Sequence, residues 1–277
     1  MEFEDVDWSI QLDQLKIQFF QSISYYDSQN DKQPLFFFHG FGQLIESYTP
    51  LILYLENEYR VIAPDLPGHG KSEELQSYAT ESVVSILKIF IQSFKFKYII
   101  LCGHSLGGLL AILLNRTISE SLVIAITPGG VKVKEGFLVQ VCKIRGLNYL
   151  LRYFWNQTFQ IIQGQVSSRT SQIIPQHHQY KAIWKLGYHN QIQKYVNSQM
   201  KYLRDFQFSG LENAYLSVQN GLFILVDNDS YIDSEAVYSL VNENKLGQIV
   251  YFNSIHSIGS AIPLELSKTI LDWLSVQ

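Results

Sequence analysis

The residues of this chain best suited to chemistry are a serine and the glycines around it, in the hexapeptide Gly103–Gly108 (GHSLGG). One apolar run, Tyr98–Cys102, precedes it and another, Leu109–Leu114, follows it, so the pattern predicts a strand, a tight turn and a helix. The glycines two positions before and after Ser105 leave room for a sharp turn that side chains would block. Such a turn places the hydroxyl at a helix N-terminus, where developing negative charge is favoured. The stretch therefore predicts a nucleophilic serine.

A serine hydroxyl needs a base to accept its proton, and that base needs a group that orients it. After a strand–turn–helix of this kind, the expected chain order is serine, acid, histidine. His256 lies in the loop between the last expected strand and the last expected helix, which is where the base belongs. The other six histidines suit structural roles better: His39 and His69 in turns after strands, His104 beside the serine but pointing elsewhere, and His177, His178 and His189 in a segment where packing or surface roles are usual.

The acid should follow the penultimate strand, where the chain offers three aspartates. Asp229 falls at the apex of the loop and is best placed to reach the imidazole. Asp227 is still close to the strand and is the main rival. Asp233 suits the N-cap of a helix that begins near Glu235. The sequence therefore predicts a site built from Ser105, His256 and Asp229.

The elements that must position these residues alternate along the chain. Continuous apolar strands that alternate with helices favour a mostly parallel sheet covered by helices on both faces. Ligand sites in such α/β sheets lie at the carboxyl ends of the strands, which is where the candidate residues gather. The expected strands are residues 15–20 and 23–26 (an antiparallel pair), 35–38, 60–63, 98–102, 121–127, 222–226 and 248–252, and the expected helices include residues 80–94, the helix after Ser105 and residues 263–276.

The segment from Val131 to Leu211 breaks this alternation. It is rich in Gln, Tyr and Trp and has helical patterns at residues 137–151 and 182–203, so we interpret it as a helical cap inserted into a core of residues 1–130 and 212–277. Its aromatic residues fit a pocket for a small apolar acyl group, but ordinary packing within the cap is the explanation that we favour. The pocket candidates are Trp155, Trp184 and Phe154.

Bulk properties fit a globular enzyme of 277 residues, with 47% hydrophobic and 17% charged residues. A net charge of -4 gives no reason to expect nucleic acid or an anionic membrane as a partner. The acidic start predicts no signal peptide, no run is long enough to cross a membrane, and two cysteines argue against a disulfide framework, so a cytoplasmic location is expected. No metal-ligand spacing or phosphate-binding glycine loop is present, so no cofactor is expected and the partner should be a small, partly apolar substrate.

Taken together, the chain resembles the α/β-hydrolase superfamily from about Leu15 to Gly130 and again from Leu211 to its end. The motifs that carry the resemblance are His39–Gly42 (HGFG), Asp65–Ser72 (DLPGHGKS), Gly103–Gly108, Asp229 after its strand, and His256 followed by Pro263 and Glu265. The resemblance implies that Ser105 is the nucleophile, His256 the base and Asp229 the orienting acid. It also implies an oxyanion hole formed by the backbone N–H groups of Phe41 and Leu106, and structural roles for Asp65 and Gly68–Ser72. Ile255 stands where relatives usually have glycine.

The reaction that fits these residues is acyl transfer to water, with an ester, lactone or thioester as substrate. Serine at the turn argues against haloalkane dehalogenases and epoxide hydrolases, the relatives that use aspartate there. Carbon–carbon bond hydrolases and the pyruvate-eliminating synthase of menaquinone synthesis share the pattern and stay open. So does a receptor of this fold that modifies its ligand slowly, which turnover would distinguish from an enzyme.

Overall fold

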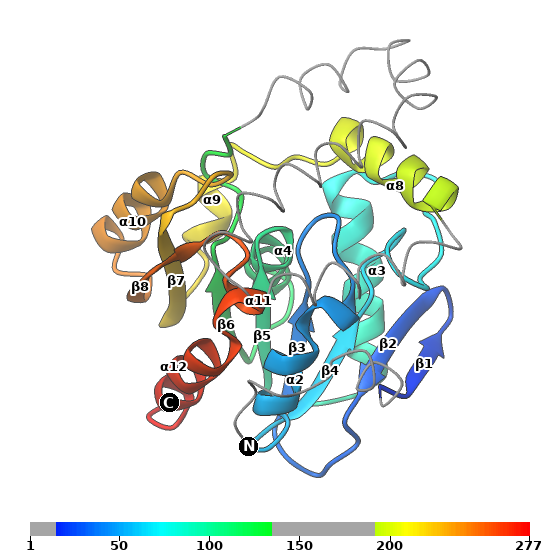
Figure 1. Ribbon diagram of the computed structural model, residues 1–277, viewed down its shortest axis with the longest axis horizontal. Helices are drawn as coiled ribbons and strands as arrows, with labels where there is room; N and C mark the ends of the chain where they lie inside the picture. Colours follow the sequence, from blue (N-terminus) through cyan, green and yellow to red (C-terminus); the bar gives the residue numbers. More distant parts are fainter. Residues whose placement is uncertain (1–14, 135–191) are drawn as a thin grey trace.

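The computed structural model describes residues 15–134 and 192–277. Within them, an eight-stranded sheet has the order β1-β2-β4-β3-β5-β6-β7-β8 (Figure 1). At one edge of the sheet, β1 (Ile17–Phe20) pairs antiparallel with β2 (Ile23–Asp27), and β2 pairs antiparallel with β4 (Arg60–Pro64). All other pairings are parallel and join β3 (Pro34–Phe38), β5 (Ile99–His104), β6 (Ser121–Ile126), β7 (Gly221–Asn228) and β8 (Gly247–Ile255).

The sheet is buried because its strands carry apolar side chains toward both faces. In β3, Phe36 and Phe38 pack on one face and Leu35 and Phe37 on the other, as the alternation of side chains along a strand requires. This is why β3 appears in the sequence as an unbroken apolar run rather than as an alternating pattern.

Helices cover both faces (Figure 1). The first face packs against α3 (Thr80–Ser93), α4 (Leu106–Asn115), α9 (Glu212–Tyr215), α10 (Ser234–Glu243) and the end of α8 (Ile192–Asp205). The second packs against η3 (Ile45–Tyr48), α2 (Thr49–Leu55), α11 (Ile258–Ala261) and α12 (Pro263–Leu274). The predicted fold class is therefore confirmed, with the antiparallel pair at residues 17–27 where it was expected.

The described ends of the segment predicted to form the cap lie side by side. The N–H of Gly130 donates to Phe208 O at 2.9 Å, and the N–H of Leu211 donates to Gly130 O at 2.7 Å. Residues 192–203 of the expected helix 182–203 lie within α8, whereas residues 137–151 and 182–191 fall outside the described residues. The cap and its domain boundaries stay a prediction.

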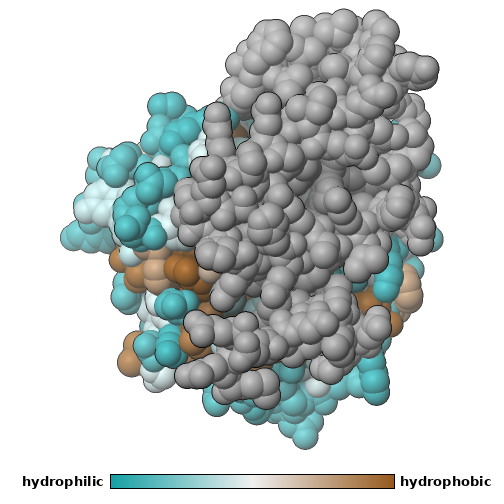
Figure 2. Space-filling view, viewed as in Figure 1, coloured by the Kyte–Doolittle hydropathy of each residue, from teal (hydrophilic) through white to brown (hydrophobic). Residues whose placement is uncertain are grey.

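Hydrophilic side chains cover most of the described surface on the face drawn in Figure 2, with apolar ones gathered over the edge formed by β7 and β8. No helix within residues 15–134 and 192–277 is long and apolar enough to cross a membrane.

Candidate active site

Ser105 occupies a strained turn between β5 and α4. Its backbone has φ 54° and ψ -112°, a conformation that residues other than glycine rarely adopt. A Cβ at Gly103 would overlap the backbone of Gly107, and a Cβ at Gly107 would overlap the backbone of Phe38. The two glycines are therefore required by contact, as the sequence pattern predicts, and they let α4 approach the end of β3 closely.

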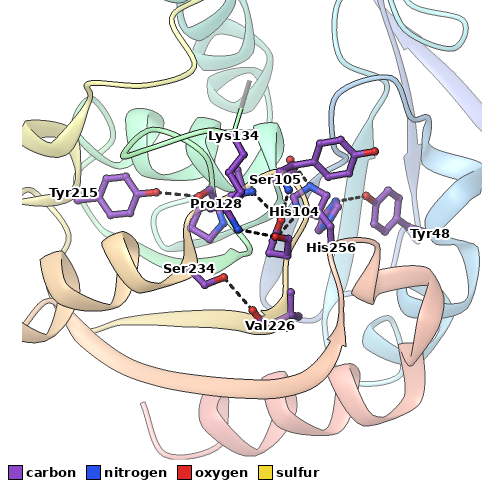
Figure 3. Close-up of polar contacts among 12 residues, drawn as sticks. Tyr48, His104, Ser105, Pro128, Lys134, Tyr215, Val226, Ser234 and His256 are labelled. Atoms are coloured by element: carbon purple, nitrogen blue, oxygen red, sulfur yellow. Dashed lines mark hydrogen bonds and ion pairs between the residues drawn. The ribbon is translucent and has the colours of Figure 1, made fainter. Parts of the chain in front are cut away.

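The three predicted residues meet at the carboxyl edge of the sheet (Figure 3). His256 follows β8, and its Nε2 lies 2.9 Å from Ser105 Oγ. Its Nδ1 lies 2.8 Å from Asp229 Oδ2, one residue beyond the end of β7. The Asp229 side chain is 1% exposed and that of His256 12%, so the pair is shielded from water while the imidazole keeps an open edge.

Asp229 is held as an ionised acceptor. Its Oδ1 accepts the backbone N–H groups of Tyr231 and Ile232, each at 2.8 Å. Burial by itself raises the pKa of this carboxyl, but the hydrogen bonds from His256 and the two amides outweigh it, so the pKa is lowered. A carboxylate facing Nδ1 keeps the proton on that nitrogen and leaves the lone pair of Nε2 to accept the Ser105 proton.

The two rival aspartates lie apart from the imidazole. Asp227 is exposed near the end of β7. Asp233 is the N-cap of α10, where its carboxylate accepts the N–H of Ala236 at 3.2 Å and pairs with Lys132 at 2.8 Å. The geometry thus favours Asp229 over both.

His104 contacts the backbone of His256. Its Nε2 lies 2.6 Å from the backbone carbonyl of His256 and its Nδ1 2.6 Å from the Tyr48 hydroxyl (Figure 3). Burial lowers the pKa of His104 to about 3, so the ring is neutral and suits a donor to His256 O better than a second base. The sequence indicates that this side chain points away from the serine, but nothing in the sequence pairs residues 104 and 256.

Two further contacts at the acid loop were not predicted. Lys134 Nζ donates to Asp229 O at 2.8 Å (Figure 3). The ring of Tyr231 lies 5.0 Å from the His256 ring, centroid to centroid. The pairing of Val133 with Ile232 and the backbone bonds beside it bring these two segments together, and long-range pairing of this kind leaves no local signal in the sequence.

The predicted oxyanion donors lie on two segments in contact. Phe41 lies in the turn after β3, closed by the N–H of Gln43 donating to Gly40 O at 3.2 Å, and Leu106 is the first residue of α4. Among the described residues, neither the Phe41 nor the Leu106 amide has a hydrogen-bond acceptor. Gly107 lets α4 pack against the end of β3, next to the turn that carries Phe41, but the role of the two amides stays a prediction.

Asp65 and His39 tie together the loops behind the site. Asp65 accepts the amides of Ile45 at 3.1 Å and Lys71 at 3.0 Å and the Ser24 hydroxyl at 2.7 Å. The His39 Nδ1–H donates to Gly40 O at 2.8 Å, and its Nε2 accepts the N–H of Leu66 at 2.9 Å. These contacts are what the expected structural roles require.

A pH dependence of stability follows from His39. Burial lowers its pKa from 6.5 to about 4, so between these values the unfolded chain binds a proton that the folded chain does not. The free energy of unfolding should therefore fall as the pH drops, by about 1.4 kcal/mol per pH unit from this residue. Urea unfolding of wild type and His39→Gln at several pH values between 7 and 4 measures this contribution. The free energy of unfolding of the variant should fall less steeply with pH, by about 1.4 kcal/mol per pH unit. Equal slopes would contradict a buried neutral His39.

The pocket residues predicted in the cap, Trp155, Trp184 and Phe154, lie outside the described residues, as do His177, His178 and His189.

Comparison with known proteins fits this geometry. The alpha/beta hydrolase fold family matches residues 33–119, which include the Phe41 turn, Asp65 and Ser105. A solved structure titled as a serine hydrolase involved in carbazole degradation superposes with a TM-score of 0.70 at 18% identity, covering 95% of this chain and 100% of that one. Residues 33–119 are thus similar to the alpha/beta hydrolase fold family, and the described residues have the fold of that solved hydrolase.

Two curated relatives match part of the chain. The (E)-2-((N-methylformamido)methylene)succinate hydrolase of Acinetobacter baylyi is 34% identical over 88 residues, 31% of this chain and 34% of the relative. A serine hydrolase-like protein of Danio rerio is 29% identical over 79 residues, 27% of this chain and 24% of the relative. These matches span about a third or less of the relatives' length, so the likeness concerns a part of each protein rather than the whole.

Ile255, the residue expected to differ from the glycine of relatives, lies directly before His256. Ile255 is the last residue of β8 and pairs with Asn228 beyond an irregularity in the register between β7 and β8. The isoleucine thus continues the strand up to His256, and the two strands end together with Asp229 and His256 adjacent to them.

Proposed function

We propose that this protein is a serine hydrolase that transfers an acyl group from an ester-like substrate to water through a covalent intermediate on Ser105. The observation that carries the proposal is the unbroken hydrogen-bond chain from Ser105 Oγ through the His256 imidazole to Asp229. A hydroxyl, a neutral imidazole with a free lone pair and a buried carboxylate in this order are the parts that such a reaction needs.

In the first step, Ser105 Oγ attacks the substrate carbonyl carbon while its proton passes to His256 Nε2. The carbonyl oxygen takes up the electron pair, and we assign the stabilisation of this oxyanion to the amides of Phe41 and Leu106; one such donor is worth about 2.7–4 kcal/mol in sites of this kind. The tetrahedral intermediate then collapses, the bond to the leaving group breaks, and the imidazolium gives the leaving group its proton.

In the second step, water attacks the acyl group on Ser105 and gives its proton to His256. Collapse releases the acid, and the proton returns from His256 to Ser105 Oγ, so the enzyme is restored. Asp229 stabilises the imidazolium in both steps and fixes its orientation. The steps at this carbonyl use only side chains and amides within residues 15–134 and 192–277.

The test is turnover of a panel of aryl esters, lactones and thioesters by the full chain, with intact-protein mass spectrometry of the quenched reaction. We expect many turnovers on at least one ester class and a mass increase equal to the acyl group, mapped to the peptide that contains Ser105. An acyl group on another residue would contradict the proposal. A single stoichiometric modification without further turnover would favour a ligand receptor instead.

A further inference from the structure

The turn that carries the predicted oxyanion donor Phe41 is held by a buried histidine that the reaction does not use. His69 lies between two glycines after β4 and is 1% exposed. Its Nδ1–H donates to Pro67 O at 3.2 Å, so Nε2 keeps a lone pair. That lone pair accepts the backbone N–H of Gly42, the residue after Phe41, at 3.2 Å. Burial and the neighbouring His39 lower the pKa of His69 well below its usual value, which keeps the acceptor neutral.

The same lone pair also accepts a donor from α8. The Gln199 side-chain Nε2 lies 2.9 Å from His69 Nε2, closer than the Gly42 amide. An imidazole nitrogen has one lone pair, so the two N–H donors share a single acceptor. The backbone turn that follows β3 and the side chain from α8 therefore meet at the same atom of His69, and Gln199 helps to hold the imidazole that accepts the Gly42 amide, although Gly42 and Gln199 lie more than 150 residues apart in the sequence.

Ring packing reinforces this link. The His69 ring lies against the Tyr202 ring, with centroids 5.3 Å apart, and Phe41 contacts both rings at 6.1 Å. Gln199 and Tyr202 are three residues apart on α8, so they share one face of the helix. One face of α8 thus touches both the imidazole and the Phe41 side chain.

The polar atoms of this helix face are unusual for simple packing. Gln199 is 1% exposed, and within residues 15–134 and 192–277 neither its Oε1 nor the buried Tyr202 hydroxyl has a hydrogen-bond partner. An unsatisfied buried polar atom costs about 1–3 kcal/mol, which an apolar side chain at residue 199 would avoid. The contact of the Gln199 amide nitrogen with His69 offsets part of this cost.

We propose that His69 is a positioning residue for the oxyanion turn and that Gln199 couples α8 to that turn through it. The inference rests on the proposed function, because it assigns the Phe41 amide to the oxyanion. The acceptor at His69 Nε2 fixes the position of the Gly42 peptide. The Gly42 peptide in turn fixes the direction of the neighbouring Phe41 N–H. A displacement of about 1 Å at such a donor costs up to about 100-fold in rate without weakening substrate binding.

The experiment compares His69→Phe, which removes the acceptor, with His69→Gln, whose amide oxygen replaces it at a similar distance from the backbone. With the best ester from the panel, we expect kcat of His69→Phe to fall about 10- to 100-fold with KM changed less than about threefold. His69→Gln should recover most of the loss. Tyr78→Phe is the matched control: it removes a buried hydroxyl from the same cluster, bonded to Leu75 N at 3.1 Å, and should lower stability but leave kcat unchanged.

A double-mutant cycle tests the coupling to α8. Gln199→Leu should lower kcat about three- to tenfold in the wild-type background and have no effect on kcat in the His69→Phe background, because it acts through the imidazole. A folded His69→Phe with wild-type kcat would overturn the inference, as would equal losses in kcat for His69→Phe and His69→Gln. If His69→Phe does not fold, Gln199→Leu in the wild-type background is the test, and an unchanged kcat in that variant would overturn the inference.

Failure of the proposed function has a different signature. It would appear as a wild-type chain that hydrolyses nothing in the panel and takes up no acyl group on Ser105. Failure of the inference would appear in a wild type that turns over normally and acylates Ser105, with His69 variants as fast as the parent.

Discussion

Ser105→Ala is expected to lower the turnover of a short-chain p-nitrophenyl ester by at least about 1,000-fold, since loss of a triad nucleophile costs about 10⁶-fold in a comparable enzyme. The fold should be unaffected, because the hydroxyl makes no contact other than that with His256 among the described residues, and alanine fits the same backbone turn. Steady-state kinetics and the urea unfolding midpoint of both forms measure the two effects.

Ser234→Ala is the matched control for this substitution. Its hydroxyl donates to Val226 O at 3.0 Å near the acid loop but does not reach the imidazole (Figure 3). We expect it to retain turnover within about twofold, as surface substitutions away from a site usually do. Turnover of Ser105→Ala within tenfold of wild type would show that another group is the nucleophile.

The fold could be predicted because its signals are local. The apolar run of β3, the glycines around Ser105 and the proline that starts α12 each constrain a few neighbouring residues, and together they imply a parallel sheet. Helices η3 and α2 between β3 and β4 were not predicted, because Ile45–Leu55 mixes apolar and polar residues without a clear helical period.

The candidate site was predictable to the extent that each residue follows a strand. Ser105, Asp229 and His256 come directly after β5, β7 and β8, and parallel strands end at one edge of the sheet. The contacts that surround them could not be predicted in the same way. His104 reaches the His256 carbonyl across 152 residues, and Gln199 reaches His69 across 130, so only the folded arrangement pairs them.

Asp229→Asn should lower kcat by about 10⁴-fold, whereas Asp227→Asn should leave it within about twofold. The reason lies in how the two oxygens of Asp229 are used. Oδ1 accepts the amides of Tyr231 and Ile232, and Oδ2 accepts His256 Nδ1–H. In the variant, the amide oxygen satisfies the two backbone N–H groups, so the amide nitrogen faces His256.

That nitrogen is a donor and cannot accept from Nδ1–H, so the imidazole is driven to the tautomer that carries its proton on Nε2. Such an imidazole has no lone pair toward Ser105 Oγ and cannot act as its base. The loop itself keeps its backbone hydrogen bonds, so the unfolding midpoint should change little while the rate collapses. Kinetics of the two asparagine variants, each with its unfolding curve, separate these effects. A larger loss in Asp227→Asn would show that the exposed aspartate at the end of β7 orients the base, and equal small losses would show that His256 works without a carboxylate.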